Sequence, residues 1–273
     1  MSFRDRLQQA MQLSPVCVGL DTDMRLIPEF LHSAPNPILE FNCRIVDATI
    51  DLVGAYKPNF AFYEGHGVVG MEALRETVAY IRAKNPDIIT VADAKRGDIG
   101  NTAAMYAQSI FEDLEFDCVT VNPYMGWDSV SPFVKDPEYG AFILCLTSNS
   151  GSHDFQYKMI DGKPLYRHVA EKSQLWNTSG NIGLVVGATH PDDMKSVREA
   201  AGDMPFFVPG IGAQGGDLAS VVQSNASGET LRALINSSRN IIYASNGKDF
   251  EDAARKATEY LRDQIGKLLQ SGV

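Results

Sequence analysis

The sequence has little that would place the chain in a membrane or outside the cell. None of its apolar runs reaches the about 18 residues that cross a bilayer, so we expect no transmembrane helix and no membrane partner. The chain begins with MSFRDRLQQAMQL, which is charged and amphipathic and has no apolar signal-peptide core. Its four cysteines, Cys17, Cys43, Cys118 and Cys145, form no CxxC pair. These absences predict a cytoplasmic protein with buried, reduced thiols.

An excess of basic residues is also missing. The chain has 24 Lys and Arg against 34 Asp and Glu, which gives a net charge of -10. Proteins that bind along nucleic-acid grooves are usually basic, so we expect no nucleic-acid partner. A local cationic pocket inside an acidic protein can still bind a small anion.

The common signatures of metal, nucleotide-cofactor and serine-hydrolase chemistry are absent as well. The five histidines form no HxH or HExxH pattern. The segment TSNSGS (147–152) lacks a GxSxG elbow, and the glycine-rich VPGIGAQGGD (208–217) is neither a Walker loop nor a GxGxxG followed by a ribose-binding acid. We therefore expect no metal site and no cofactor.

What the sequence does contain is a regular alternation of short apolar runs and longer helical patterns. Several runs are almost continuously apolar, which is typical of strands that are covered on both faces. The predicted strands are 15–21, 54–60, 88–95, 118–123, 141–147, 182–188 and 205–210. The clearest predicted helices are 36–53, 71–84, 191–202 and 249–270.

This alternation predicts a parallel sheet built from right-handed βαβ units. About eight units in 273 residues favour an α/β fold, a (β/α)8 TIM barrel that forms a single domain over residues 1–273. A doubly wound open sheet is the alternative. Two segments compete for the eighth strand, RALINSS (232–238) and IIYAS (241–245), and β-propensity slightly favours the second.

Polar side chains stand at the ends of the predicted strands. Asp93 and Lys95 follow the apolar run IIT and, by strand alternation, point the same way, while Asp98 lies just beyond in a loop. The other strand-end residues are Asp21, Lys57, Asn122 and Ser148. One charged pair could be a surface ion pair, but five strands that end in this way indicate a site at the mouth of a barrel.

A second cluster is the glycine-rich segment 208–217, which follows the seventh predicted strand. Its glycines surround Gln214 and would let backbone N–H groups close on an anion, and a helix would begin at Asp217. TIM barrels often bind phosphate with the loops after strands 7 and 8. Arg239 is placed to supply a cation from the eighth.

These segments together resemble the orotidine 5'-phosphate decarboxylase family, from about Val16 to Tyr243. DAKRGDIGNT matches the DxKxxD signature with its trailing threonine. NPYMGWDS, TSNSG, VPGIGAQGGD and SSRNIIYAS are similar to the longer bacterial branch of that family. DxKxxD alone is shared with related sugar-phosphate decarboxylases and aldolases, and the combination with Lys57, TSN and Gln214 is more specific.

The resemblance implies a cofactor-free carboxy-lyase that makes UMP and carbon dioxide in pyrimidine biosynthesis. It implies that Lys57, Asp93, Lys95 and Asp98 form a charged catalytic network in which Lys95 protonates C6 of the pyrimidine. It further implies a homodimer, with Asp98 and Thr102 reaching into the neighbouring subunit's site. The other implied substrate contacts are Asp21, Lys57, Ser148, Pro209, Gln214 and Arg239, and the strand-end residue Asn122 is a further predicted substrate contact. RALINSS would be the eighth strand and NIIYA a short helix.

Three points stay open at this stage. A metal-dependent sugar-phosphate decarboxylase or aldolase on the same barrel, and a non-catalytic sensor of phosphorylated nucleotides, are the alternative functions. The loop 149–163 is long and polar enough to close over a substrate. Arg96 receives no role from the pattern or from the resemblance.

Overall fold

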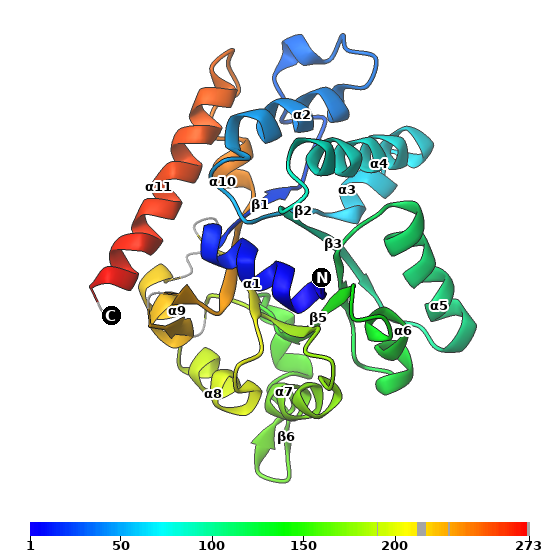
Figure 1. The fold of residues 1–273 in the computed structure, drawn as a ribbon, viewed down its shortest axis with the longest axis vertical. Coiled ribbons are helices and arrows are strands. Elements are labelled where there is room, and N and C mark those ends of the chain that lie inside the picture. Colours follow the sequence, from blue (N-terminus) through cyan, green and yellow to red (C-terminus); the bar gives the residue numbers. More distant parts are fainter. Residues whose placement is uncertain (190, 212–216, 229, 272–273) are drawn as a thin grey trace.

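The structure, a computed structural model, describes residues 1–189, 191–211, 217–228 and 230–271. Within these residues, eight parallel strands close into a barrel in the order β1-β12-β9-β8-β5-β4-β3-β2 (Figure 1). The strands are β1 (Val16–Leu20), β2 (Ala55–Pro58), β3 (Ile89–Arg96), β4 (Cys118–Val121), β5 (Gly140–Leu146), β8 (Ile182–Val186), β9 (Phe206–Val208) and β12 (Ala233–Ser237). The predicted TIM barrel is confirmed, and the open doubly wound sheet is wrong.

Helices surround the barrel as an outer layer (Figure 1). They are α1 (Phe3–Leu13), α2 (Pro37–Thr49), α3 (Phe60–Glu64), α4 (Gly67–Lys84), α5 (Gly100–Gln108), α6 (Ser131–Val134), α7 (Leu165–Trp176), α8 (Pro191–Ala201), α9 (Leu218–Asn225), α10 (Arg239–Ile242) and α11 (Phe250–Gln270). Short helical turns η1 (Glu29–Leu31), η2 (Ser109–Asp113), η3 (Trp127–Ser129) and η4 (Ser150–Asp154) lie in the connections. Two small hairpins pair β6 (Met159–Ile160) with β7 (Lys163–Pro164) and β10 (Ala226–Ser227) with β11 (Thr230–Leu231).

The competition for the eighth strand is decided in favour of the first segment. β12 pairs with both β1 and β9, so Ile235 lies between Val16 and Val208 and closes the barrel. The segment 241–245, which propensity favoured, is not a strand. Its first residues belong to α10, where the N–H groups of Ile241 and Ile242 donate to the Ser238 carbonyl at 2.9 and 3.0 Å.

Local signals set several boundaries. The Asn36 side chain accepts a hydrogen bond from Leu39 N at 3.2 Å and caps α2. Asp217 caps α9 by accepting from Ala219 N at 3.0 Å, which confirms the predicted helix start. The predicted strand 54–60 is too long, because the Asn59 side chain accepts from Ala61 N and starts α3 directly after Pro58.

The inside of the barrel is a packed apolar core that α1 closes at one end. Phe3, Leu7 and Ala10 of α1 are buried against inward-facing strand residues such as Phe142 and Phe207. Phe3 lies so close to Gly140 that a Cβ there would come within 2.1 Å of its ring. Because α1 covers the ends where the strands begin, the opposite end remains for a site.

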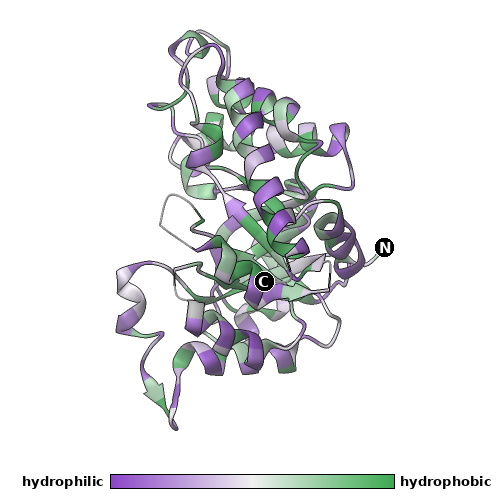
Figure 2. Cartoon of the chain, turned by 90° about the vertical axis from the view of Figure 1, so that its left-hand side faces the viewer, coloured by the Kyte–Doolittle hydropathy of each residue, from purple (hydrophilic) through white to green (hydrophobic). Residues whose placement is uncertain are grey.

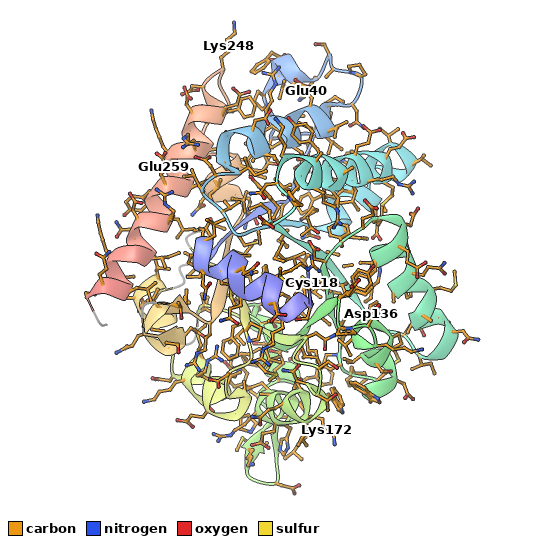
Figure 3. All side chains as sticks on the ribbon, viewed as in Figure 1. Glu40, Cys118, Asp136, Lys172, Lys248 and Glu259 are labelled. Carbon is orange, nitrogen blue, oxygen red and sulfur yellow. The ribbon has the colours of Figure 1, made fainter. Side chains whose placement is uncertain are left out.

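The outer surface carries the charge. Hydrophobic residues concentrate in the strands and on the inner sides of the helices (Figure 2). Cys118 lies toward the middle of the molecule, whereas Glu40, Lys172, Lys248 and Glu259 project from the outside (Figure 3). All four cysteines are free thiols, and three of them are buried. No helix in the described ranges combines the length and the hydropathy that a membrane span requires.

Candidate active site

Four charged side chains at the carboxyl ends of β1, β2 and β3 form one continuous row. The Lys57 ammonium lies 2.6 Å from Asp21 Oδ1 and 3.5 Å from Asp93 Oδ2. The Lys95 ammonium lies 2.6 Å from the other Asp93 oxygen, Oδ1. The charges therefore alternate along the row Asp21, Lys57, Asp93, Lys95. The network that the resemblance implied had Asp98, and not Asp21, as its fourth member.

Both inner members of this row are held in their charged forms. Burial alone would lower the pKa of Lys57, but the negative charges of Asp21 and Asp93 outweigh it and raise the pKa above its usual value. Burial alone would raise the pKa of Asp93, and the positive charges of Lys57 and Lys95 hold it below its usual value. At neutral pH the site thus keeps a largely buried carboxylate between two ammonium groups.

The backbone at Lys95 departs from a regular strand. Its φ is +45°, in the left-handed region, and the pairing of β3 with β4 shifts register between Ala92 and Arg96. Thr120 on β4 supports this bulge, since its hydroxyl accepts a hydrogen bond from Lys95 N at 3.0 Å and donates to Asp93 Oδ1 at 3.1 Å. Strained backbone of this kind clusters at functional sites.

The backbone around Asp21 is fixed by two tyrosines. Tyr63 donates a hydrogen bond to the Leu20 carbonyl at 3.0 Å, and Tyr243 donates to the Asp21 carbonyl at 3.1 Å. The Tyr243 hydroxyl also accepts from Asp23 N at 2.6 Å. Burial raises the pKa of Tyr243 to about 12, so the hydroxyl keeps the proton that it donates.

Three buried polar atoms near the mouth have no hydrogen-bond partner among the described protein groups. They are Ser148 Oγ, Thr189 Oγ1 and Asn236 Oδ1, from the ends of β5, β8 and β12. Gly187 leaves room for the Ser148 hydroxyl, because a Cβ there would stand 2.2 Å from Oγ. A buried polar atom without a partner costs about 1–3 kcal/mol, so a group of them marks a surface suited to a polar ligand.

Asp98 and Thr102 do not join the row within this chain. Asp98 Oδ1 accepts a hydrogen bond from Ile99 N at 2.8 Å, and among the described residues Asp98 forms no ion pair. Thr102 is exposed on the first turn of α5. Asn122 is also exposed, and its side chain accepts from Tyr124 N at 3.0 Å.

The structure describes two of the three expected phosphate contacts, Pro209 and Arg239. Pro209 follows β9, and its carbonyl accepts a hydrogen bond from Ala188 N at 3.2 Å. Arg239 is exposed at the start of α10. Gln214 lies outside the described residues. In the loop 149–163, η4 and the hairpin of β6 and β7 are formed, and closure of this loop stays a prediction.

The sequence reasoning missed Thr120, Tyr243 and Asn236. For two of them a signal was available. Thr120 is two residues after the inward-facing Cys118, and Asn236 is two residues after the inward-facing Leu234. Polar residues at such inward positions near a strand's carboxyl end point into the mouth. Tyr243 gave no such signal, because its role depends on where α10 folds back.

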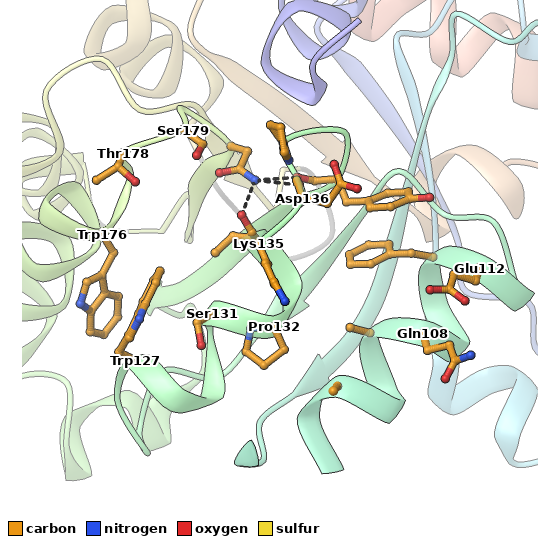
Figure 4. Close-up of a pocket in the computed structure, with 17 residues that line it drawn as sticks. Gln108, Glu112, Trp127, Ser131, Pro132, Lys135, Asp136, Trp176, Thr178 and Ser179 are labelled. Carbon is orange, nitrogen blue, oxygen red and sulfur yellow. Dashed lines mark hydrogen bonds between the residues drawn. The ribbon is translucent and has the colours of Figure 1, made fainter. Parts of the chain in front are cut away.

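A large cavity lies elsewhere on the molecule. It has a volume of about 1090 Å³ and is lined by residues of α5, η3, α6 and α7 and of the segments that follow α6 and α7, including Trp127, Lys135 and Trp176 (Figure 4). None of the strand-end residues lines it, so the charged row, and not this cavity, is the candidate active site. Over the described part of the chain, no group of three or more His, Cys, Asp and Glu side chains is arranged to hold a metal ion.

The chain is similar over almost its whole length to known proteins. Residues 14–256 match the family model described as orotidine 5'-phosphate decarboxylase / HUMPS family. The chain is 46% identical over 270 residues to an orotidine 5'-phosphate decarboxylase of Ralstonia nicotianae, which covers 98% of this chain and 99% of that protein. It is 47% identical over 256 residues to an enzyme of the same name from Flavobacterium johnsoniae, covering 94% and 93%. The solved OMP decarboxylase of Leishmania donovani is similar in structure, with a TM-score of 0.86, 36% identity and 99% coverage of both chains.

The lowered pKa of Asp93 predicts how stability depends on pH. Asp93 holds its proton less tightly in the folded chain than in the unfolded chain, so its charge stabilises the fold above the unfolded pKa of about 3.9. This contribution is lost as the pH falls through the folded pKa. As the pH falls from about 5 to about 3, we expect the unfolding free energy of the wild type to decrease relative to that of Asp93→Asn, which has no carboxyl group to protonate at this position. Urea unfolding measures it, and a difference that does not vary with pH would contradict the assignment.

Proposed function

The chain belongs to the orotidine 5'-phosphate decarboxylase / HUMPS family, and we propose that it converts orotidine 5'-phosphate to UMP and carbon dioxide without a cofactor. It is a carboxy-lyase in this proposal, acting in pyrimidine biosynthesis. The observation that carries the proposal is the row Asp21, Lys57, Asp93, Lys95 at the mouth of the barrel. The free thiols are in keeping with a cytoplasmic enzyme.

The chemistry explains why such a row is needed. Loss of carbon dioxide from C6 of the pyrimidine leaves an electron pair on a carbon that has no adjacent electron sink. Enzymes lower barriers by about 8–23 kcal/mol, and this reaction needs the upper part of that range. A cation that is held in place beforehand, where the negative charge develops, supplies the largest single contribution.

Lys95 is the proposed cation and proton donor. Its ammonium is about half exposed, with 53% of the side chain accessible, whereas Lys57 is only 4% accessible. Lys95 can therefore reach a ligand in the mouth, and it would give C6 the proton that replaces carbon dioxide. The buried Lys57 would keep Asp93 ionised and would not itself meet C6.

Asp93 is proposed to act on the ground state. Its charge is fixed by two lysines, and a substrate carboxylate placed beside it would be repelled until carbon dioxide has left. Asp21 and Lys57 would bind the ribose hydroxyls. Ser148, whose buried hydroxyl has no partner among the described groups, would bind the pyrimidine ring.

The phosphate contacts are proposed from position. Pro209 follows β9 and Arg239 follows β12, so both border the mouth on the side away from Asp93 in the strand order. Together with Gln214 they would hold the phosphate, and Asn122 would contribute a further contact from β4. Binding energy from this remote group can hold the reacting ring in place.

We also propose that the active form is a homodimer. Exposed apolar side chains lie close to Asp98 and Thr102 in sequence or on the adjoining η3 segment, which contacts α5. They are Ile99, Met105, Tyr106, Tyr124, Met125 and Trp127. Exposed apolar groups gathered on one face are typical of a protein interface. In such a dimer Asp98 and Thr102 would enter the partner's site, in keeping with their absence from the row in this chain.

The function is tested with the purified protein, orotidine 5'-phosphate and EDTA. We expect the ultraviolet absorbance of the substrate to fall and UMP to appear at the same rate with and without the chelator. Activity that EDTA removes and Mg²⁺ restores would favour the metal-dependent sugar-phosphate decarboxylases or aldolases. Nucleotide binding without any turnover would favour a sensor.

The role of Lys95 predicts a separation of binding from turnover. We expect Lys95→Ala to lower the rate of UMP formation by at least about 10³-fold while UMP still binds, because the proton donor is lost and the pocket remains. Calorimetry and the absorbance assay measure the two effects. Lys84→Ala is the control, since Lys84 on the outer helix α4 forms a similar 2.7 Å pair with Asp47 on α2. Substantial turnover in Lys95→Ala would contradict the role.

The shared site predicts complementation. After subunit exchange in an equal mixture of Lys95→Ala and Asp98→Ala, we expect about one quarter of wild-type activity, because half of the dimers are hybrids and each has one intact site of two. A mixture of Lys95→Ala with Asp93→Asn is the control and should stay inactive, since both residues serve the same subunit's site. Lack of recovery in the first mixture, once exchange is verified, would count against a shared site.

A further inference from the structure

The residue after Lys95, Arg96, is held on three sides by other parts of the chain. Its Nη2 donates to Glu64 Oε1 at 2.6 Å. Its guanidinium carbon lies 5.2 Å from the centre of the Phe60 ring and 5.0 Å from that of Tyr106. A planar guanidinium can stack on rings and bind a carboxylate at the same time, which an ammonium cannot do equally well. Arg96 thus connects the end of β3 to α3 and α5.

The backbone of Arg96 is fixed as well. Its carbonyl accepts a hydrogen bond from Asn122 N at 2.7 Å, and the residue pairs with Val121 directly after the register shift. The preceding residue, Lys95, is the one with φ of +45°. A side chain other than glycine keeps such a conformation only when its surroundings hold it there. On the carboxyl side of Lys95, Arg96 provides these surroundings.

Lys95 depends on this support because little holds its own side chain. The ammonium is about half exposed, and within the described part of the chain its ion pair is with Asp93. If the backbone returned to an ordinary strand conformation, the direction of the side chain would change and the 2.6 Å contact with Asp93 would be lost.

We infer that Arg96 is a positioning residue, which fixes the left-handed backbone of Lys95 and so directs its ammonium toward the reacting carbon. This inference rests on the proposed function. The side chain of Arg96 contacts α3 and α5 and not the row, so it would act without touching the substrate. Its effect on the reaction passes entirely through the geometry of Lys95.

The test compares Arg96→Met, which removes the guanidinium, with Arg96→Lys, which keeps a charge near Glu64. Kinetics with orotidine 5'-phosphate are measured below the melting temperature of each variant. Two ligands are titrated: UMP, and a UMP analogue with an anionic oxygen at C6. Arg75→Met is the matched control, because Arg75 forms a 2.7 Å ion pair with Asp113 on the outer surface.

For Arg96→Met we expect kcat to fall by about 10- to 100-fold, the loss that a displacement of about 1 Å causes, while KM and the UMP dissociation constant change less than about threefold. The ratio of the dissociation constants of UMP and the anionic analogue should fall by a similar factor, because the analogue gains affinity from the Lys95 ammonium near its C6 oxygen. Arg96→Lys should recover part of kcat, and Arg75→Met should match the wild type. A merely structural role would weaken both ligands equally.

Unchanged kcat in Arg96→Met, or equal losses of UMP and analogue binding, would overturn the inference. If Arg96→Met does not fold, Glu64→Ala removes one of the three contacts. In that variant kcat and the preference for the analogue must both fall several-fold while UMP binding is kept. Wild-type protein without turnover would overturn the proposed function, and the inference with it. Active wild type with an unaffected Arg96→Met variant would overturn the inference alone.

Discussion

The burial of one ammonium group, that of Lys57, governs the arrangement of the whole site. A charge in this position is tolerated only between opposite charges, and Asp21 and Asp93 supply them from the two neighbouring strands. Removal of either carboxylate would leave an uncompensated buried charge. The excess negative charge of Asp93 in turn attracts Lys95, which is exposed. The alternating row therefore follows from a single buried cation, and the proposed proton donor, Lys95, is the member that reaches solvent.

Much of this arrangement could be predicted from the sequence, because it depends on topology. Parallel strands that close into a barrel bring their carboxyl ends together, so Asp21, Lys57 and Asp93 had to meet once the strands were recognised. The eighth strand was harder. IIYAS has the better β-propensity, but the barrel needed Ile235 beside Val16, and only the closed sheet contains that information.

Other features of the site could not be predicted from the amino-acid sequence alone. Alternation assumes a regular strand, whereas Lys95 meets Asp93 through a bulge that Thr120 and the contacts of Arg96 support. Arg96 received no role from the sequence because its contacts depend on the fold: Phe60 and Glu64 lie on α3, far earlier in the chain, and Tyr106 reaches Arg96 only through the packing of α5. Asp98 forms no ion pair among the described residues, and its proposed role lies in the partner's site, about which the pattern of one chain carries no direct information.

The position of α1 determines by which end of the barrel a ligand can enter and leave. With Phe3, Leu7 and Ala10 packed against the far end of the barrel core, only the mouth at the carboxyl ends of the strands is open to a ligand. In the proposed reaction the substrate enters and both products leave through the mouth of the barrel. The loops at the carboxyl ends of the strands therefore affect both binding and release. A domain fused ahead of Met1 would extend from the sealed end and leave that passage free.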